Sequence, residues 1–251
     1  MTIIIFIIIL TVLVLVHEFG HFIVAKSFGI RVDEFGLGFP PKIWSRKWGE
    51  TLYSLNVIPF GGFVKIFGED LDAPMSDIGG DNDNDKSRSF QHRPKWIQAL
   101  VLVAGVAFNI IFAWLIISFL EHSIVFGSID TFNIIKETTI GLIKFIGNIF
   151  LGQSDFSQVA GPIGIARIVG QAQSLGFAPL LSLVALISIN LAVINLVPFP
   201  ALDGGRLLIV LIEAIIHRPI SPGIVRWVNA ISFVLLIVLM ITVTVHDILK
   251  L

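Results

Sequence analysis

The chain has 251 residues, of which 55% are hydrophobic and only 14% charged, and its mean hydropathy is +0.90. An ordinary soluble domain has about 25% charged residues, so this composition excludes that class and indicates a membrane protein. The net charge of −1 provides no basic surface for nucleic acid, and the absence of cysteine excludes disulfides and thiolate metal sites. Any metal must therefore be held by histidine and carboxylate side chains.

Four segments are long and apolar enough to cross a bilayer, which takes about 20 residues. The first lacks the positively charged start and the small-residue cleavage pattern of a signal peptide, so we expect it to remain as a membrane helix. The third is expected to break at its end, where Pro198 and Pro200 cannot continue a helix. The four spans are predicted at about residues 3–25, 96–120, 179–199 and 224–246.

The segment after the first span, residues 31–67, carries short runs of β-branched and aromatic residues separated by proline and glycine. This pattern predicts a small β-sheet. Residues 68–89 are polar and acidic, which is typical of a flexible loop. Residues 81–85 resemble the start of a calcium loop, but Lys86 and His92 stand where that loop needs glycine and glutamate. We therefore do not expect a calcium site.

The distribution of lysine and arginine predicts the orientation in the membrane. Ten of the 17 lysine and arginine residues lie in residues 26–95, so this loop should be cytoplasmic. The N-terminus should then lie on the outer side of the cell (inner) membrane. Residues 121–178 then face outward and include an apolar stretch, 132–150, that is expected to lie as a helix in the membrane interface. His246 and Asp247 are interpreted as residues of the interface on that side.

The first span contains the sequence HEFGH, an unusual cluster of ionisable groups in an apolar helix. His17 and His21 are four residues apart and share a helix face, so both imidazoles can bind one metal ion. Each such group costs a few kcal/mol in a membrane if it has no partner. The H-E-x-x-H spacing is typical of zinc hydrolases, in which Glu18 would act as the general base.

A catalytic zinc ion needs a third protein ligand and an open position for water. Asp203 follows the broken third span and is the only acidic residue between Phe156 and Ile212. We prefer the role of ligand over the alternative of a helix N-cap, which aspartate also favours. Asn195 could donate its amide to a substrate carbonyl, or could equally form an interhelical hydrogen bond.

Several motifs resemble one known family when they are read in order. HEFGH, PFGGFVKIFGE, AGVAFNIIFA, AGPIGIA and SINLAVINLVPFPALDGGRLL are similar to the site-2 protease family of intramembrane zinc metalloproteases, closest to its bacterial RseP-like group. The resemblance implies one catalytic zinc ion held by His17, His21 and Asp203, with Glu18 as the base. It also implies that Asn195 positions the substrate. The sheet around Gly61 and Gly62 is implied to be membrane-associated, re-entering the membrane surface near the zinc, and to offer an edge to an unwound substrate.

The chain departs from the family pattern in two places. Val106 replaces the proline of the family motif AGP-x-x-N, which puts a kink in the second span in doubt, although Asn109 is retained. The outer segment 121–178 is too short for the PDZ domains of RseP-type proteins, so we expect none there. A partner could act as an adaptor in their place.

The sequence thus predicts one mainly α-helical membrane domain with four transmembrane helices and a small sheet in the first cytoplasmic loop. The predicted function is zinc-dependent intramembrane cleavage of single-span proteins or signal-peptide remnants in the lipid bilayer. A membrane metal-ion carrier and a catalytically inactive protein that binds membrane segments are the alternatives. The carrier needs a continuous polar path, for which the remaining spans have few ionisable groups.

Overall fold

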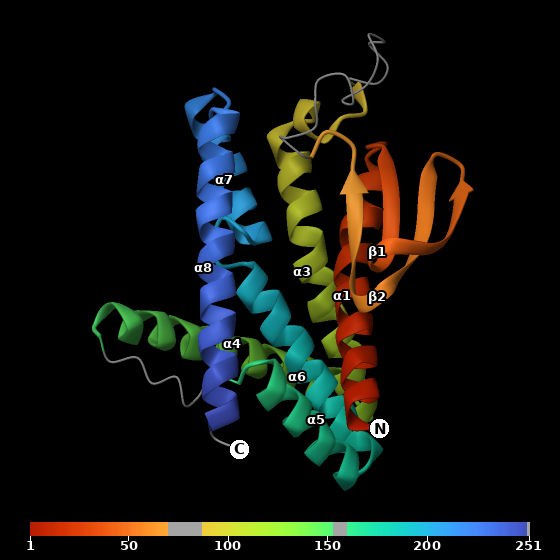
Figure 1. Ribbon diagram of the computed structural model, residues 1–251, viewed down its shortest axis with the longest axis vertical. Helices are drawn as coiled ribbons and strands as arrows, with labels where there is room; N and C mark the ends of the chain where they lie inside the picture. Colours follow the sequence, from red (N-terminus) through yellow and green to blue (C-terminus); the bar gives the residue numbers. More distant parts are fainter. Residues whose placement is uncertain (70–86, 153–159, 250–251) are drawn as a thin grey trace. The chain divides into compact units, whose positions relative to one another are not determined.

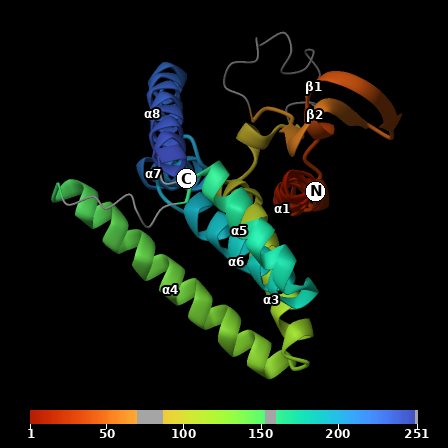
Figure 2. The same ribbon diagram turned by 60° about the horizontal axis from the view of Figure 1, so that its bottom comes forward.

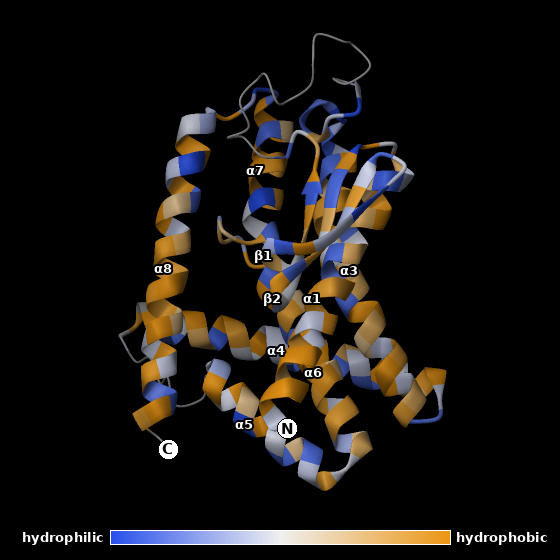
Figure 3. Cartoon of the chain, turned by 45° about the vertical axis from the view of Figure 1, so that its right-hand side comes forward, coloured by the Kyte–Doolittle hydropathy of each residue, from blue (hydrophilic) through white to orange (hydrophobic). Residues whose placement is uncertain are grey.

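The computed structural model describes residues 1–69, 87–152 and 160–249. In these residues four helices are long and apolar enough to cross a membrane, and their surfaces are largely hydrophobic (Figure 3). The predicted fold class, a mainly helical membrane protein with a small sheet, is confirmed. The four helices are α1 (Thr2–Ser27), α3 (Lys95–Leu120), α6 (Phe177–Asn195) and α8 (Pro222–Leu249).

Helix α6 ends earlier than expected, at Asn195 rather than near residue 199. Pro198 restricts the backbone before it and offers no N–H to a helical ladder, so the break spreads toward the N-terminus. The chain then turns tightly, with the N–H of Phe199 donating to the Val197 carbonyl over 2.6 Å. Helix α7 (Asp203–Ile216) follows, and its 14 residues are fewer than a bilayer crossing requires.

The chain divides into two compact units, which are described separately. The first unit contains residues 1–9 and 109–195 and the chain from residue 230 onward. The second unit contains residues 10–108 and 196–229. Most of α1, the sheet, the first half of α3 and all of α7 therefore belong to the second unit.

The sheet of the second unit is made of two long antiparallel strands, β1 (Val32–Trp48) and β2 (Thr51–Ile66). Both strands bend, so that Phe35 of β1 pairs with Tyr53 on one side and with Val64 on the other. Among the described residues, 62–66 pair on one side only and form a sheet edge. The sheet lies beside α1 (Figures 1 and 2). Its location in a cytoplasmic loop stays a prediction.

A hydrophobic core joins these elements of the second unit. Val101 and Leu102 of α3 pack with the end of the sheet where Val32 pairs with Ile66. Val210 brings α7 into the same cluster. Fully burying one such side chain stabilises a fold by about 1.5–3 kcal/mol. The buried members are Ala25, Ile30, Val32, Ile66, Phe90, Ile97, Val101, Leu102 and Val210.

The first unit is helical in its described residues. Helix α4 (Ile124–Phe150) starts well before the predicted stretch 132–150, and its N-cap Ser123 accepts a hydrogen bond from the Phe126 N–H. Helices α5 (Pro162–Leu175) and α6 lie side by side (Figure 2). Apolar residues of α3, α4 and α6 form the core of this unit. The position of α4 in a membrane interface stays a prediction.

Helix α3 continues without interruption through Val106, the position of the family proline. Asn109 is fully buried, and its backbone carbonyl accepts a 2.9 Å hydrogen bond from the Ser188 hydroxyl of α6. This contact joins α3 to α6 through the backbone at Asn109. Most of the acidic segment 68–89, including the calcium-like residues 81–85, lies outside the described residues.

Asp247 has a partner that the sequence did not suggest. Its side chain is buried, and Oδ2 accepts a 2.8 Å hydrogen bond from the N–H of Gly164, in the first turn of α5. An aspartate of α8 thus satisfies an unpaired donor at the start of another helix, where its charge also favours the helix dipole. A Cβ atom on Gly161, the N-cap, would lie 2.7 Å from the same oxygen.

Replacing Gly161 with alanine is therefore expected to lower the stability of the protein by about 1–3 kcal/mol, the cost of overpacking. Gly141→Ala is the matched control, because a Cβ there meets nothing within 4 Å and improves the helix propensity of α4. Thermal unfolding in detergent compares the two variants. A Gly161→Ala protein as stable as the Gly141→Ala protein would contradict the packing described here.

Candidate active site

Helix α1 brings the two histidines of HEFGH to one face, as the spacing predicts. His17 and His21 are each 7% exposed, and their Nε2 atoms are 3.2 Å apart. Two lone pairs that face each other at this distance repel unless a proton or a cation lies between them. The pair is thus arranged to share a positive ligand.

Asp203 reaches the histidines from the first turn of α7. Its Oδ2 lies 2.9 Å from Nε2 of His17 and 3.3 Å from Nε2 of His21. The N-cap of α7 is Leu202, so Asp203 is not a capping residue in this structure. One oxygen of Asp203 thus lies close to both imidazole nitrogens and completes a group of three candidate ligand atoms.

Two glycines allow α7 to start directly after the broken helix. A Cβ on Gly204 would lie 2.3 Å from the Val197 carbonyl oxygen, and one on Gly205 would lie 2.2 Å from that of Phe199. The predicted close approach of the backbone at this pair is thus present. It allows the loop to fold over the first turn of α7, which holds Asp203 at the histidines.

The three ligand atoms fit a zinc ion. Ligands bound tetrahedrally at about 2.0–2.1 Å are separated from one another by roughly 3.3 Å. The observed separations of 2.9, 3.2 and 3.3 Å are close to this value. Two imidazoles and one carboxylate also match the donor set of catalytic zinc sites. Among the described residues this is the one group of three or more such side chains arranged to hold a metal.

The backbone of α3 orients His21. Nδ1 of His21 lies 2.8 Å from the carbonyl oxygen of Val101. A carbonyl only accepts, so Nδ1 carries the proton and a neutral His21 presents a lone pair at Nε2. Hydrogen bonds of this kind to the second nitrogen of a metal-binding histidine fix the tautomer and the ring orientation.

Helices α1 and α3 approach closely at two glycines beside the histidines. A Cβ on Gly20 would lie 2.5 Å from the Ala104 carbonyl oxygen. One on Gly105 would lie 2.4 Å from Nε2 of His21 and 2.8 Å from Nε2 of His17. Small residues let membrane helices approach in this way. The backbone of α3 thus forms one wall of the ligand cluster.

Glu18 faces the sheet edge. The backbone N–H of Val64 donates a 3.1 Å hydrogen bond to Oε2 of Glu18. This N–H points away from β1, so Val64 presents its backbone to the open side of the edge 62–66. The candidate base and the edge of the sheet therefore meet directly.

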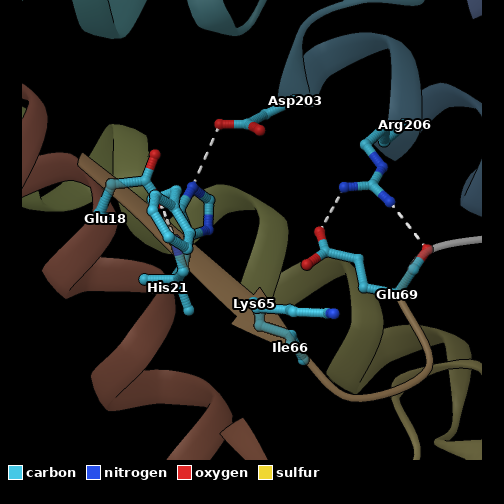
Figure 4. A pocket seen from close by; sticks show the side chains of 9 residues that line it. Glu18, His21, Lys65, Ile66, Glu69, Asp203 and Arg206 are labelled. Carbon is cyan, nitrogen blue, oxygen red and sulfur yellow. Dashed lines mark hydrogen bonds and ion pairs between the residues drawn. The ribbon is translucent and has the colours of Figure 1, made fainter. Parts of the chain in front are cut away.

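A cavity of about 400 Å³ opens beside these groups. It is bounded by α1, by the sheet edge and by the first turn of α7 (Figure 4). An extended peptide could reach Glu18 and Asp203 from this space. The residues around it are Glu18, His21, Phe63, Val64, Lys65, Ile66, Glu69, Asp203 and Arg206.

The other predicted site residues are Gly61, Gly62 and Asn195. Gly61, with φ of +75°, packs against Val14 of α1, and Gly62 packs against Leu15. They set the approach of the sheet to α1, while residues 63–66 border the cavity. Asn195 is the last residue of α6 and belongs to the first unit. Substrate contact by Asn195, Gly61 and Gly62 stays a prediction.

The comparisons with known proteins agree with this arrangement. A family model described as Peptidase family M50 matches residues 5–239. The chain belongs to peptidase family M50. This is the site-2 protease family that the sequence motifs resemble, so the protein is a membrane zinc metalloprotease of the site-2 type.

Three relatives illustrate the match. A protein of Clostridium perfringens is 30% identical over 329 positions, covering 94% of this chain and 95% of the relative. One of Nostoc is 30% identical over 347 positions, covering 95% and 93%. One of Staphylococcus aureus is 24% identical over 421 positions, covering 98% of both. Each is named as a candidate zinc metalloprotease. These alignments are longer than this chain, so the relatives contain residues without a counterpart here.

No PDZ domain is indicated in this chain beside the family match. Where it is described, the segment between α3 and α6 contains α4 and α5 and no strand.

Three contributors to the site were not recognised from the sequence. Val101 and Val64 act through backbone atoms, which every residue type provides, so the sequence does not reveal them. Gly105 acts through the absence of a side chain. Of the three, only Gly105 had a signal, since it belongs to the motif AGVAFN and is the one glycine of α3.

Gly105→Ala is expected to push the two imidazoles apart and to weaken zinc binding on the order of 10–100-fold, as disturbed orientation of metal ligands typically does. Gly147→Ala in α4 is the control, because its Cβ would meet nothing within 4 Å. Elemental analysis after dialysis against a graded chelator measures the retained metal. Equal zinc retention by both variants would show that the wall at Gly105 does not hold the histidines.

Proposed function

We propose that the protein cleaves membrane-spanning polypeptides within the bilayer, at the site formed by His17, Glu18, His21 and Asp203. The observation that carries this proposal is the position of Glu18, which lies next to the ligand cluster and also against an exposed strand edge. A base between a metal site and a peptide-binding edge is what hydrolysis of an extended chain requires.

In the proposed mechanism, Nε2 of His17, Nε2 of His21 and Oδ2 of Asp203 would hold one zinc ion. When bound, zinc would lower the pKa of a water molecule and polarise the peptide carbonyl. Val64 holds Oε2 of Glu18, and the other oxygen, Oε1, would accept a proton from the water that adds to the peptide carbonyl carbon. Glu18 would pass this proton to the amine that leaves when the C–N bond breaks. The carbonyl of Val101 keeps His21 in the tautomer that leaves Nε2 free to bind.

The substrate is proposed to pair as an added strand with the edge 62–66. A protease can attack a membrane helix only after the helix has unwound, and strand pairing satisfies the backbone groups that unwinding exposes. Gly61 and Gly62 keep this edge against α1, and Asn195 donates its amide to the substrate. Candidate substrates are single-span membrane proteins and signal-peptide remnants.

The proposed orientation follows from the basic loop. With ten of the 17 lysine and arginine residues between residues 26 and 95, this loop faces the cytoplasm and the N-terminus faces outward across the cell membrane. The site then lies toward the cytoplasmic side. A partner protein takes the adaptor role that PDZ domains have in RseP-type proteins.

Glu18→Gln is expected to reduce cleavage of a tagged single-span substrate by about 10²–10⁴-fold, because the amide cannot accept the proton. The amide oxygen can still accept from Val64, so the variant should retain zinc. Glu121→Gln, on the turn after α3, is the control and should cleave normally. Purified protein in detergent, with cleavage and bound zinc measured in parallel, tests this. An active Glu18→Gln enzyme would remove Glu18 from the mechanism.

The short segment between α3 and α6 favours substrates whose outer part is already trimmed. We expect a substrate with a tail of a few residues on the outer side to be cleaved faster than the same span carrying a folded outer domain. Equal amounts of the two substrates, cleaved in one reaction and separated by mass, provide the comparison. Efficient cleavage of the substrate with its intact outer domain would contradict this preference.

A further inference from the structure

Arg206 joins two walls of the cavity. It lies on α7 one turn after Asp203, and its guanidinium binds Glu69, just past the end of β2 (Figure 4). Nη1 donates to the Glu69 carboxylate, and Nη2 donates to the Glu69 carbonyl oxygen over 3.0 Å. Arg206 therefore binds both the side chain and the backbone of Glu69, in the segment that follows the sheet edge.

This fork has a geometric effect that a single ion pair lacks. Two parallel hydrogen bonds from a planar guanidinium fix orientation as well as distance. The Glu69 side chain is 16% exposed and that of Arg206 is 35% exposed, so the contact is partly shielded from water. The contact ties the strand that contains Val64 to the helix that contains Asp203.

The second unit contains a comparable ion pair that does not touch the sheet edge. Lys95 of α3 binds Glu213 of α7 over 2.6 Å, and these side chains are 36% and 13% exposed. Both ion pairs hold α7, and their exposure is nearly the same. Of the two pairs, only that of Arg206 and Glu69 joins α7 to the segment directly after the edge 62–66. Variants of the two pairs can therefore distinguish an effect on the stability of α7 from an effect on the site.

We propose that Arg206 is a positioning residue for the protease reaction: through Glu69 it fixes the sheet edge that receives the substrate relative to the helix that carries Asp203. This inference rests on the proposed function. Successive residues of an added strand are about 3.3 Å apart. A small movement of the sheet edge relative to the metal site would therefore bring neighbouring peptide bonds of the substrate to the site of cleavage. Arg206 thus sets which peptide bond is cut.

The test compares Arg206→Gln with Lys95→Gln in cleavage of one single-span substrate. For Arg206→Gln we expect KM to rise on the order of tenfold, with kcat and bound zinc changing much less, because binding and register are lost and not the chemistry. Mass spectrometry should show additional products cut at neighbouring peptide bonds. Lys95→Gln should keep the wild-type KM and the single product.

Two further variants keep the test decisive if Arg206→Gln folds poorly. Arg206→Lys keeps the charge but cannot form the fork, so it should fold and still give additional products. The double variant Glu69→Arg with Arg206→Glu restores the ion pair and should recover part of the wild-type KM. A single product from Arg206→Lys, or loss of zinc from all Arg206 variants, would overturn the inference.

A measurement without substrate separates this inference from the proposed function. Because the chain has no cysteine, spin labels can be attached at Lys65→Cys on the edge and Ile215→Cys on α7. Pulsed electron resonance should give a narrow distance distribution that Arg206→Gln broadens and Lys95→Gln does not. Unchanged width would overturn the inference even if the protein is an active protease. Cleavage is measured on the unlabelled wild-type protein, because Lys65 borders the cavity. No cleavage by that protein, together with the expected widths, would contradict the proposed function alone.

Discussion

Ionisable side chains in an apolar helix need partners, and the second unit is organised around this requirement. An unpaired charge at membrane depth costs several kcal/mol, so HEFGH is tolerated only where other segments supply partners. The carboxylate of Asp203 comes from α7, the carbonyl of Val101 from α3 and the N–H of Val64 from the sheet. The same contacts hold these groups in the arrangement on which the proposed catalytic roles rest. One set of interactions therefore provides both their polar partners and their geometry.

Much of this arrangement could be predicted from the sequence because its signals are periodic or chemical. The spacing of His17 and His21 follows directly from helix geometry. Asp203 stood out because few acids occur in that part of the chain. The four spans could be predicted from the length of their apolar stretches. The end of α6 was predicted a few residues too late, because local turns set helix ends and composition does not encode these turns.

Other features depend on contacts between distant segments and could not be predicted. The partner of Asp247 is 83 positions away along the chain, and nothing near Asp247 indicates that it satisfies the start of α5. The twofold pairing of β1 and β2 arises from bends in the strands, whereas the sequence pattern indicated only short runs. The alternative of an N-cap role for Asp203 could be excluded only from the structure, in which α7 begins at Asp203 and its N-cap is Leu202.

The hydrogen bond between Val64 and Glu18 has a consequence for how this protein can vary. Successive backbone N–H groups of a strand point to opposite sides. Inserting or deleting one residue between Gly61 and Val64 would turn the outward N–H toward β1 and leave Glu18 facing a different group. Chain length in this stretch is therefore fixed by the active site. Length changes should be tolerated instead at the turn around Gly49, where the strands end and a side chain would meet only open space.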